Sequence, residues 1–167
     1  MEIKYRMGQL EDLEEISSMV KSAIKVMIEQ DIYQWDEFYP DEEILKKDIE
    51  KKQLYAGVIN NQIAVIFVLN QHCFEDYKNG KWKHKDEPYY VIHRLCVNPA
   101  LQNKGVAKWT MHYIEQELLT AGIQAIRLDV FAQNPYAIRL YDKQGFSRVG
   151  YMDGRKGRFY LMEKYLK

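Results

Sequence analysis

The chain has 167 residues, of which 47% are hydrophobic, and its 24 basic side chains balance its 24 acidic ones. That length suits one compact domain with a sizeable core, and the charge balance argues against a general nucleic-acid or membrane-surface binder. The two cysteines do not suggest a disulfide scaffold, the first residues are not a signal peptide, and the longest apolar run, 63–69, is too short to span a bilayer. We therefore expect a cytoplasmic protein, with neither a nucleic-acid nor a membrane partner.

The first 70 residues alternate between strand and helix patterns. Apolar residues recur at helical spacing from Leu13 to Met27, and the acidic residues at the start of this segment suit the helix dipole. Asp41 is a candidate cap for a second, short helix, and Asn60 and Asn61 suit a tight hairpin between two strands. The expected elements are a strand over 3–7, helices from 11 to about 30 and over 42–51, and strands over 54–59 and 62–69.

An aromatic segment separates the first two helices. It places Tyr33, Trp35, Phe38 and Tyr39 within seven residues, which is unusual for a loop. One interpretation is a hydrophobic plug over the core. The other is one wall of a substrate pocket, with Tyr33, Trp35 and Tyr39 as candidate substrate-binding residues.

Residues 71–87 form a polar, lysine-rich segment, and Asn79 with Gly80 suits a turn within it. We expect a solvated hairpin near the mouth of a substrate site. The segment also holds three potential metal ligands, His72, Cys73 and His84. No fourth ligand has a suitable spacing, so we expect no metal site.

The central stretch of the chain has a strand, a glycine-containing turn and a helix in succession. A β-branched apolar run predicts a strand over 89–97, and Pro99 ends it because proline has no N–H to donate. Helical spacing then continues to about Gly122, which suits a left-handed helix end. Residues 102–107 offer successive backbone N–H groups at the helix start, where an anion is well placed, and Gly105 has no side chain to hold a phosphate away.

A second helix with clear end signals follows a strand over 126–130. Asn134 is a good N-cap and Pro135 a good first residue, while Gly145 and Phe146 match a glycine cap with a hydrophobic contact behind it. Two more strands are expected over 146–151 and 158–165. The total of about seven strands and four helices indicates an α/β fold with a mixed sheet.

Two motifs in this half of the chain resemble those of GNAT-type N-acetyltransferases. Gln102-x-x-Gly105-x-Ala107 is similar to their Q/R-x-x-G-x-G/A motif, and the helix from Asn134 to Tyr141 is similar to the one that follows it. Many members have glycine where this chain has Ala107, although alanine is also common there. The resemblance implies one N-acetyltransferase domain over 1–167, with a mixed, mostly antiparallel seven-stranded sheet and about four helices on both faces.

The same resemblance implies acetyl-CoA as co-substrate and no metal. In the family, the glycine turn cradles the pyrophosphate, and pantetheine lies like an extra strand beside the fourth strand, where the fifth splays away from it. Backbone N–H groups of that fourth strand are the expected donors to the thioester carbonyl. The cofactor-binding residues so implied are Leu95, Cys96, Val97, Gln102, Asn103, Lys104, Gly105, Val106, Ala107, Lys108, Asn134, Ala137 and Tyr141.

Two residues are candidates for catalysis. In the family, a tyrosine at the position of Tyr141 reaches the CoA sulfur; the alternative is that it only packs against Phe146. His93 lies on the strand that leads to the acetyl group and has a suitable pKa for a general base, but it could instead be a satisfied core histidine. Glu87 or water alone could also serve as the base. Cys96 lies in an apolar strand without an activating partner, so we expect it to pack rather than act as a nucleophile.

We therefore expect direct transfer of an acetyl group from acetyl-CoA to a primary amine in a ternary complex. The acceptor could be a small molecule or a peptide, and the protein could be a monomer or a homodimer. The first alternative is a non-catalytic acyl-CoA-binding module, against which Tyr141 argues. A nucleotide-hydrolysing domain is the second, but the turn lacks G-x-x-x-x-G-K-[ST].

Overall fold

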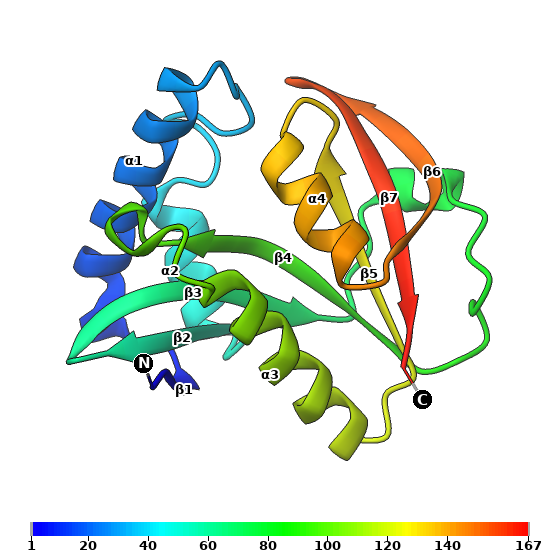
Figure 1. The fold of residues 1–167 in the computed structure, drawn as a ribbon, viewed down its shortest axis with the longest axis horizontal. Coiled ribbons are helices and arrows are strands. Elements are labelled where there is room, and N and C mark those ends of the chain that lie inside the picture. The colour runs from blue at the N-terminus through cyan, green and yellow to red at the C-terminus, as the bar shows by residue number, and fades with distance from the viewer. Residues whose placement is uncertain (1, 167) are drawn as a thin grey trace. The chain divides into compact units, whose positions relative to one another are not determined.

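The computed structural model describes residues 2–166, and the chain forms two compact units (Figure 1). The first unit contains residues 2–69 with Arg94–Thr110, and the second contains Asn70–His93 with residues 111–166. Strand β4 (Tyr89–Val97) and helix α3 (Val106–Thr120) each contribute to both units. No helix among the described residues is long and apolar enough to cross a membrane.

The strands form the expected seven-stranded mixed sheet, in the order β1-β2-β3-β4-β5-β7-β6. Strands β4 and β5 pair in parallel, whereas the pairs β1–β2, β2–β3, β5–β7 and β6–β7 are antiparallel. The strand bounds are β1 Lys4–Met7, β2 Leu54–Ile59, β3 Gln62–Asn70, β5 Ala125–Phe131, β6 Ser147–Gly154 and β7 Gly157–Tyr165.

In the first unit, α1 (Leu13–Glu29) and α2 (Glu42–Glu50) share a core with β2 and β3. As predicted, Asp41 caps α2, since its side chain accepts a hydrogen bond of 2.9 Å from the N–H of Ile44. The predicted hairpin between β2 and β3 is also confirmed: Asn60 and Asn61 have φ of 49° and 62°, the left-handed pair that a tight two-residue turn requires. A second cluster holds Val106 against Leu95, Val97 and two residues of β3.

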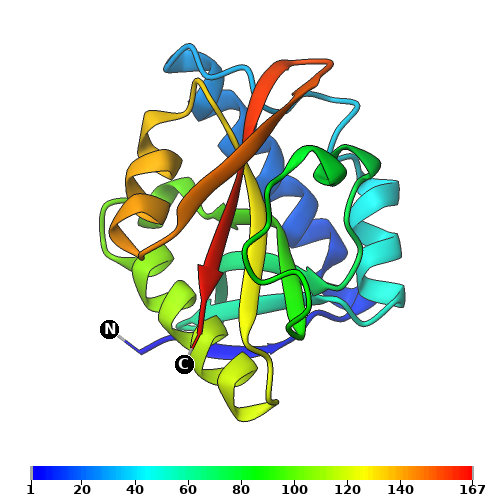
Figure 2. The same ribbon diagram turned by 90° about the vertical axis from the view of Figure 1, so that its right-hand side faces the viewer.

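In the second unit, α4 (Pro135–Lys143) packs beside β5 (Figure 1). The predicted solvated hairpin over 71–87 is wrong. The segment contains no strand; it folds into a short 3-10 helix, Glu75–Asn79, and lies along β5 and β6 (Figure 2). The reason is Tyr77, which is 2% exposed, stacks on Trp82 and donates a hydrogen bond of 2.6 Å to Asp129. One buried aromatic thus ties a polar segment to the sheet.

Strand β4 is regular and paired with β5 only at its start. Its pairing with β5 covers only Tyr89 to Val91, although both strands continue further. Arg94, in the interior of β4, has φ of 49°, which is left-handed. The strict alternation that would put His93 and Leu95 on one face therefore does not hold across Arg94.

Candidate functional site

The turn that precedes α3 is fixed at its start by Asn98. The N–H of Asn98 donates to the carbonyl of Ala64 at 2.7 Å, and its side-chain amide donates to the carbonyl of Ile63 at 3.1 Å. Its side-chain oxygen accepts from the N–H of Ala100 at 3.0 Å and caps a 3-10 turn, Pro99–Leu101. The first two bonds tie the turn to β3, and the third closes the 3-10 turn, so together they fix where α3 begins.

The turn itself contains two left-handed residues, Asn103 with φ of 63° and Gly105 with φ of 80°. The first intrahelical bond of α3 runs from the N–H of Trp109 to the carbonyl of Gly105, at 3.0 Å. The N–H groups from Gly105 to Lys108 precede that bond, and no side chain or carbonyl among residues 2–166 accepts them. The start of α3 is therefore an open set of donors.

The charges at this helix start favour an anion. The first turn of α3 has no acidic residue, and Lys104 and Lys108 are exposed beside the positive end of the helix dipole. Gln102 to Gly105 are exposed as well, whereas Val106 is buried against Leu95 and Val97. A row of N–H donors without a capping side chain, flanked by two exposed ammonium groups, is suited to phosphate.

Helix α4 has the ends that its sequence predicts. The side-chain oxygen of Asn134 accepts from the N–H of Ala137 at 3.1 Å, and Pro135 is the first helical residue. Gly145 is left-handed, with φ of 89°, and the N–H of Phe146 donates to the carbonyl of Tyr141 at 3.0 Å. These bonds hold the last turn of α4, which carries Tyr141.

Tyr141 is buried, with 8% of its surface exposed, and its ring meets that of Phe146 edge-on at 5.6 Å. Burial raises the pKa of Tyr141 far above its usual value, and the negative charge of Asp129 raises it further. Within the described part of the chain, no group forms a hydrogen bond with the hydroxyl. The phenol of Tyr141 therefore stays un-ionised near neutral pH, and its packing against Phe146 is the contact that the alternative interpretation expects.

His93 is also buried. Its Nε2 lies 2.9 Å from Oδ1 of Asn70 and 3.1 Å from the carbonyl oxygen of His72, and its ring meets that of Phe74 edge-on. Both of these oxygens accept, so Nε2 carries the proton of the neutral ring and donates it. The other ring nitrogen, Nδ1, is the acceptor in this tautomer.

Residues 26–146 match the acetyltransferase (GNAT) family, which is more than half of the chain. The chain belongs to this family. The matched residues include both motifs identified in the sequence, the glycine turn before α3 and the helix α4, and they extend over β2, β3 and β4 as well.

Three relatives of similar length are informative. The S-(2-succino)cysteine N-acetyltransferase of Bacillus subtilis (strain 168) is 22% identical over 172 residues, which cover 100% of this chain and 98% of the relative. A crystal structure from Staphylococcus aureus Mu50, of a protein assigned as an acetyltransferase, has 31% identity and a TM-score of 0.77, and covers 98% of this chain and 99% of that one. The PaiA N-acetyltransferase of Thermoplasma acidophilum, solved with coenzyme A, has 21% identity and a TM-score of 0.72 over 99% of both chains, and that likeness shows the fold.

The aromatic segment of this GNAT chain divides between core and surface. Trp35 is 8% exposed and belongs to the core cluster of α1 and α2, as the plug interpretation expects. Tyr33 is exposed and donates a hydrogen bond to Asp31, and Phe38 is 69% exposed. Tyr39 is partly buried and packs against the same core cluster. Trp35 therefore anchors the segment, and a role for these residues in substrate binding stays a prediction.

The buried ion pair that Arg94 of β4 forms was not identified from the sequence. Arg94 forms a two-bond ion pair with Asp48 and a third hydrogen bond with Tyr39. The sequence does place both charges on apolar faces. Asp48 lies between the apolar Leu45 and Ile49 of a helix, and Arg94 lies within an apolar strand. A charge on a buried face needs a partner, but the sequence does not say which one.

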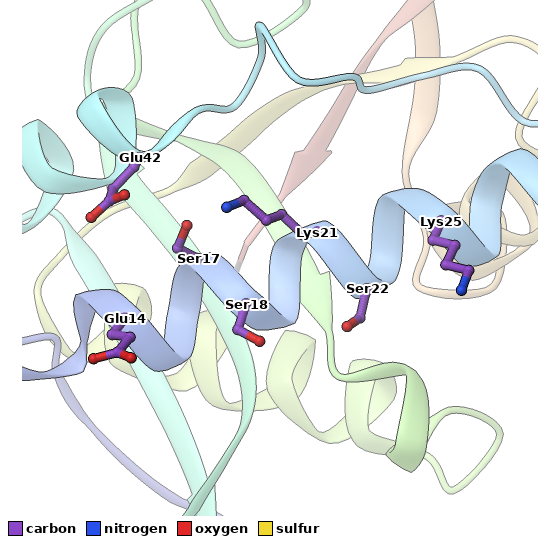
Figure 3. A pocket seen from close by; sticks show the side chains of 7 residues that line it. All are labelled: Glu14, Ser17, Ser18, Lys21, Ser22, Lys25 and Glu42. Atoms are coloured by element: carbon purple, nitrogen blue, oxygen red, sulfur yellow. The ribbon is translucent and has the colours of Figure 1, made fainter.

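A shallow hollow of about 420 Å³ runs along the exposed side of α1 (Figure 3). Its lining is polar throughout: Glu14, Ser17, Ser18, Lys21, Ser22, Lys25 and Glu42. Sites for small molecules are predominantly lined by apolar and aromatic side chains, and this hollow has none. It is therefore a polar surface groove and not the expected acceptor pocket.

Proposed function

We propose that this protein is an acetyl-CoA-dependent N-acetyltransferase that acetylates a primary amine by direct attack in a ternary complex. The observation that carries the proposal is the open start of α3, where Gly105 is left-handed and the following N–H groups lack acceptors among the described residues. The coenzyme A bound to the Thermoplasma acidophilum GNAT protein supports the choice of ligand. We take the whole chain to be one catalytic domain.

The diphosphate of CoA binds the turn 102–108. There the N–H groups and the ammonium groups of Lys104 and Lys108 offset its negative charge. No acidic side chain in the first turn of α3 opposes it.

Pantetheine then follows the part of β4 that β5 does not pair with, beyond Val91. The N–H of Asn98 donates to β3, so strand alternation directs the N–H groups of Leu95 and Val97 to the opposite edge, and that of Cys96 toward β3. Leu95 and Val97 are therefore the donors that we assign to the thioester carbonyl.

The reaction needs few groups. The acceptor nitrogen attacks the carbonyl carbon, the oxygen gains charge and accepts the strand N–H bonds, and the C–S bond then breaks to release the CoA thiolate. The acceptor nitrogen loses its proton to a base. Tyr141 donates a hydrogen bond to the thiolate, and its raised pKa makes full proton transfer to the sulfur unfavourable. Burial raises the pKa of the Cys96 thiol to about 12, which supports packing and not a covalent intermediate.

The base is assigned to Nδ1 of His93, with Glu87 or water as alternatives. The relatives differ in their acceptors: one is named for S-(2-succino)cysteine, and another, 30% identical over 59 residues, for the alanine of ribosomal protein bS18. The second match covers 35% of this chain and 40% of the relative, from Salmonella typhimurium. Both a small amino-acid derivative and a polypeptide amine therefore belong in a test.

The test is a thiol-release screen with acetyl-CoA against amino acids, their S-substituted cysteine derivatives, peptides with free N-termini and polyamines. We expect amine-dependent release of CoA, together with one acetyl group gained by the acceptor in mass spectrometry. Binding of CoA without release for any amine would favour the non-catalytic acyl-CoA-binding module. Absence of CoA binding would overturn the proposal altogether.

A further inference from the structure

Arg94 holds a backbone conformation that its own chemistry disfavours. It is a non-glycine residue with φ of 49° in the interior of a strand. Such a residue is uncommon, and it persists only where the surrounding structure over-determines it. Something in the fold must therefore hold Arg94 in place.

The side chain of Arg94 shows what holds it. Its Nε and Nη2 donate to the two carboxylate oxygens of Asp48, both at 2.7 Å, and its Nη1 donates to the hydroxyl of Tyr39 at 2.8 Å. The two charged side chains are only 10% and 8% exposed. Burial alone would lower the pKa of Arg94, but the bonds from Asp48 and Tyr39 outweigh it and raise that pKa. A planar guanidinium with both ends of its fork engaged has little freedom to rotate.

The partner is itself fixed. Asp48 lies on α2 between Leu45 and Ile49, and these two residues are buried in the core cluster of the first unit. The carboxylate is thus part of a packed helix and not of a mobile loop. The pair connects that helix directly to the irregular residue of β4.

Residue 94 precedes Leu95, whose N–H we assigned to the thioester carbonyl. We propose that the Arg94–Asp48 pair is a positioning clamp, which keeps β4 left-handed at residue 94 and so aims the N–H of Leu95 at the developing oxyanion. This inference rests on the proposed function. Arg94 is a positioning residue that acts through the backbone, because its guanidinium is already engaged by Asp48 and Tyr39.

A glycine substitution at residue 94 distinguishes this positioning role from simple stabilisation of the core. Glycine adopts positive φ without a clamp, whereas alanine does not. Arg94→Ala and Arg94→Gly both remove the ion pair, so both lose whatever stability it provides. Only the alanine variant also loses the backbone conformation.

The experiment compares Arg94→Ala, Arg94→Gly, Asp48→Asn and the double variant Asp48→Asn/Arg94→Gly on an amine that wild type acetylates. We expect kcat to fall about 100-fold in Arg94→Ala, the loss typical for one displaced oxyanion donor, with KM for acetyl-CoA changed less than about threefold. Arg94→Gly should retain a kcat at least about tenfold above that of Arg94→Ala. Asp48→Asn should lower kcat in the wild-type background and have no further effect in the glycine background.

Asp12→Asn is the matched control. It breaks the two-bond pair with Arg6 in the same unit, a pair that does not involve β4. We expect a lower melting temperature with kcat within about twofold of wild type, because exposed pairs stabilise only modestly. If Arg94→Ala does not fold, Asp48→Asn carries the same test.

Equal kcat in Arg94→Ala and Arg94→Gly, or unchanged kcat in Asp48→Asn, would overturn the clamp. A second measurement does not depend on turnover: amide exchange at Cys96, whose N–H is directed toward β3, should be faster in Arg94→Ala than in Arg94→Gly, and equal rates would also overturn the clamp. If wild type acetylates no amine, the proposed function fails, while the exchange experiment still decides whether the pair holds the strand.

Discussion

The two helices that follow β4 begin in opposite ways. Helix α4 is closed by its own sequence, since the side chain of Asn134 occupies the N–H of Ala137 and Pro135 removes another donor. Helix α3 begins at Val106 without such a cap among the described residues, after a left-handed glycine and between two exposed lysines. Water, a side chain or a ligand can satisfy the N–H groups of such a helix start. We infer that a ligand does so in α3.

This difference separates two tasks. In the function we propose, the open start of α3 binds the cofactor, and the closed helix α4 holds one side chain, Tyr141, for the chemical step. Changes in the first should therefore alter affinity, and changes in the second should alter turnover. The variants below test that separation, beginning with the largest expected effect.

Gly105→Glu should weaken CoA binding at least about 100-fold. The new carboxylate would lie where the diphosphate approaches, and the left-handed backbone would add a strain of about 1–2 kcal/mol to folding. Calorimetry with CoA measures the affinity, and thermal unfolding checks the fold.

Gly122→Glu is the matched control for that variant. Gly122 follows α3, has the same φ of 80°, and a Cβ there would meet nothing within 4 Å. The two variants thus share the strain but differ in which end of the helix they change. An equal loss of affinity in both would refute the assignment of the diphosphate to the start of α3.

Tyr141→Phe should leave CoA affinity unchanged and lower kcat and kcat/KM together, by roughly 10–1000-fold. In the proposed mechanism the hydroxyl acts only as the thiolate departs, so the expected loss belongs to the transition state. Because the pKa of Tyr141 is raised, wild-type activity should show no loss from ionisation of this phenol up to about pH 10. Wild-type turnover in the variant would leave Tyr141 with its packing role against Phe146.

His93→Gln should lower kcat/KM by roughly tenfold near pH 7, at the weak end of general-base effects. The glutamine amide can still donate to the carbonyl of His72, so the structural bond is kept while the titrating nitrogen is lost. The pH profile of kcat/KM is the measurement: an acidic limb near pH 6–7 should be lost or moved. An identical limb in both proteins would assign it to the substrate or to Glu87, and would return His93 to the core.

Asn134 has the smallest expected effect. Asn134→Ala should remove about 1 kcal/mol of stability by loss of the cap, or about 2–4 °C in melting temperature. Asn134→Asp keeps the capping oxygen and so should keep the melting temperature, but it should weaken CoA binding several-fold if the side-chain amide contacts the cofactor. Unchanged affinity in the aspartate variant would make Asn134 a cap and nothing more.

The parts of the fold that the sequence predicted well are those determined by neighbours along the chain. The hairpin at Asn60, the caps at Asp41 and Asn134, and the left-handed glycine at 145 all depend on residues within one turn. Local backbone chemistry decides such features, so their residue types identify them. The location of the turn at Gly105 belongs to this class as well.

The parts that were missed depend on distant partners. The burial of Tyr77 follows from Asp129, 52 residues away, and the position of Arg94 follows from Asp48, 46 residues away. The polar composition of 71–87 predicts a solvated segment, because the sequence does not show that one of its aromatic side chains is buried in the core. The left-handed turn at Arg94 had no local signal, because glycine and asparagine are the residues that usually mark it.

The most direct test of the central claim is to follow backbone amides by NMR while CoA is added. The account predicts large, saturable shifts at Gly105, Val106, Ala107 and Lys108, whose N–H groups gain phosphate as acceptor, and a smaller shift at Ala137, whose N–H is already bonded to Asn134. Pantetheine, which lacks the diphosphate, should leave the first four amides unchanged. Equal shifts with pantetheine, or no shift of these four at saturating CoA, would contradict the account.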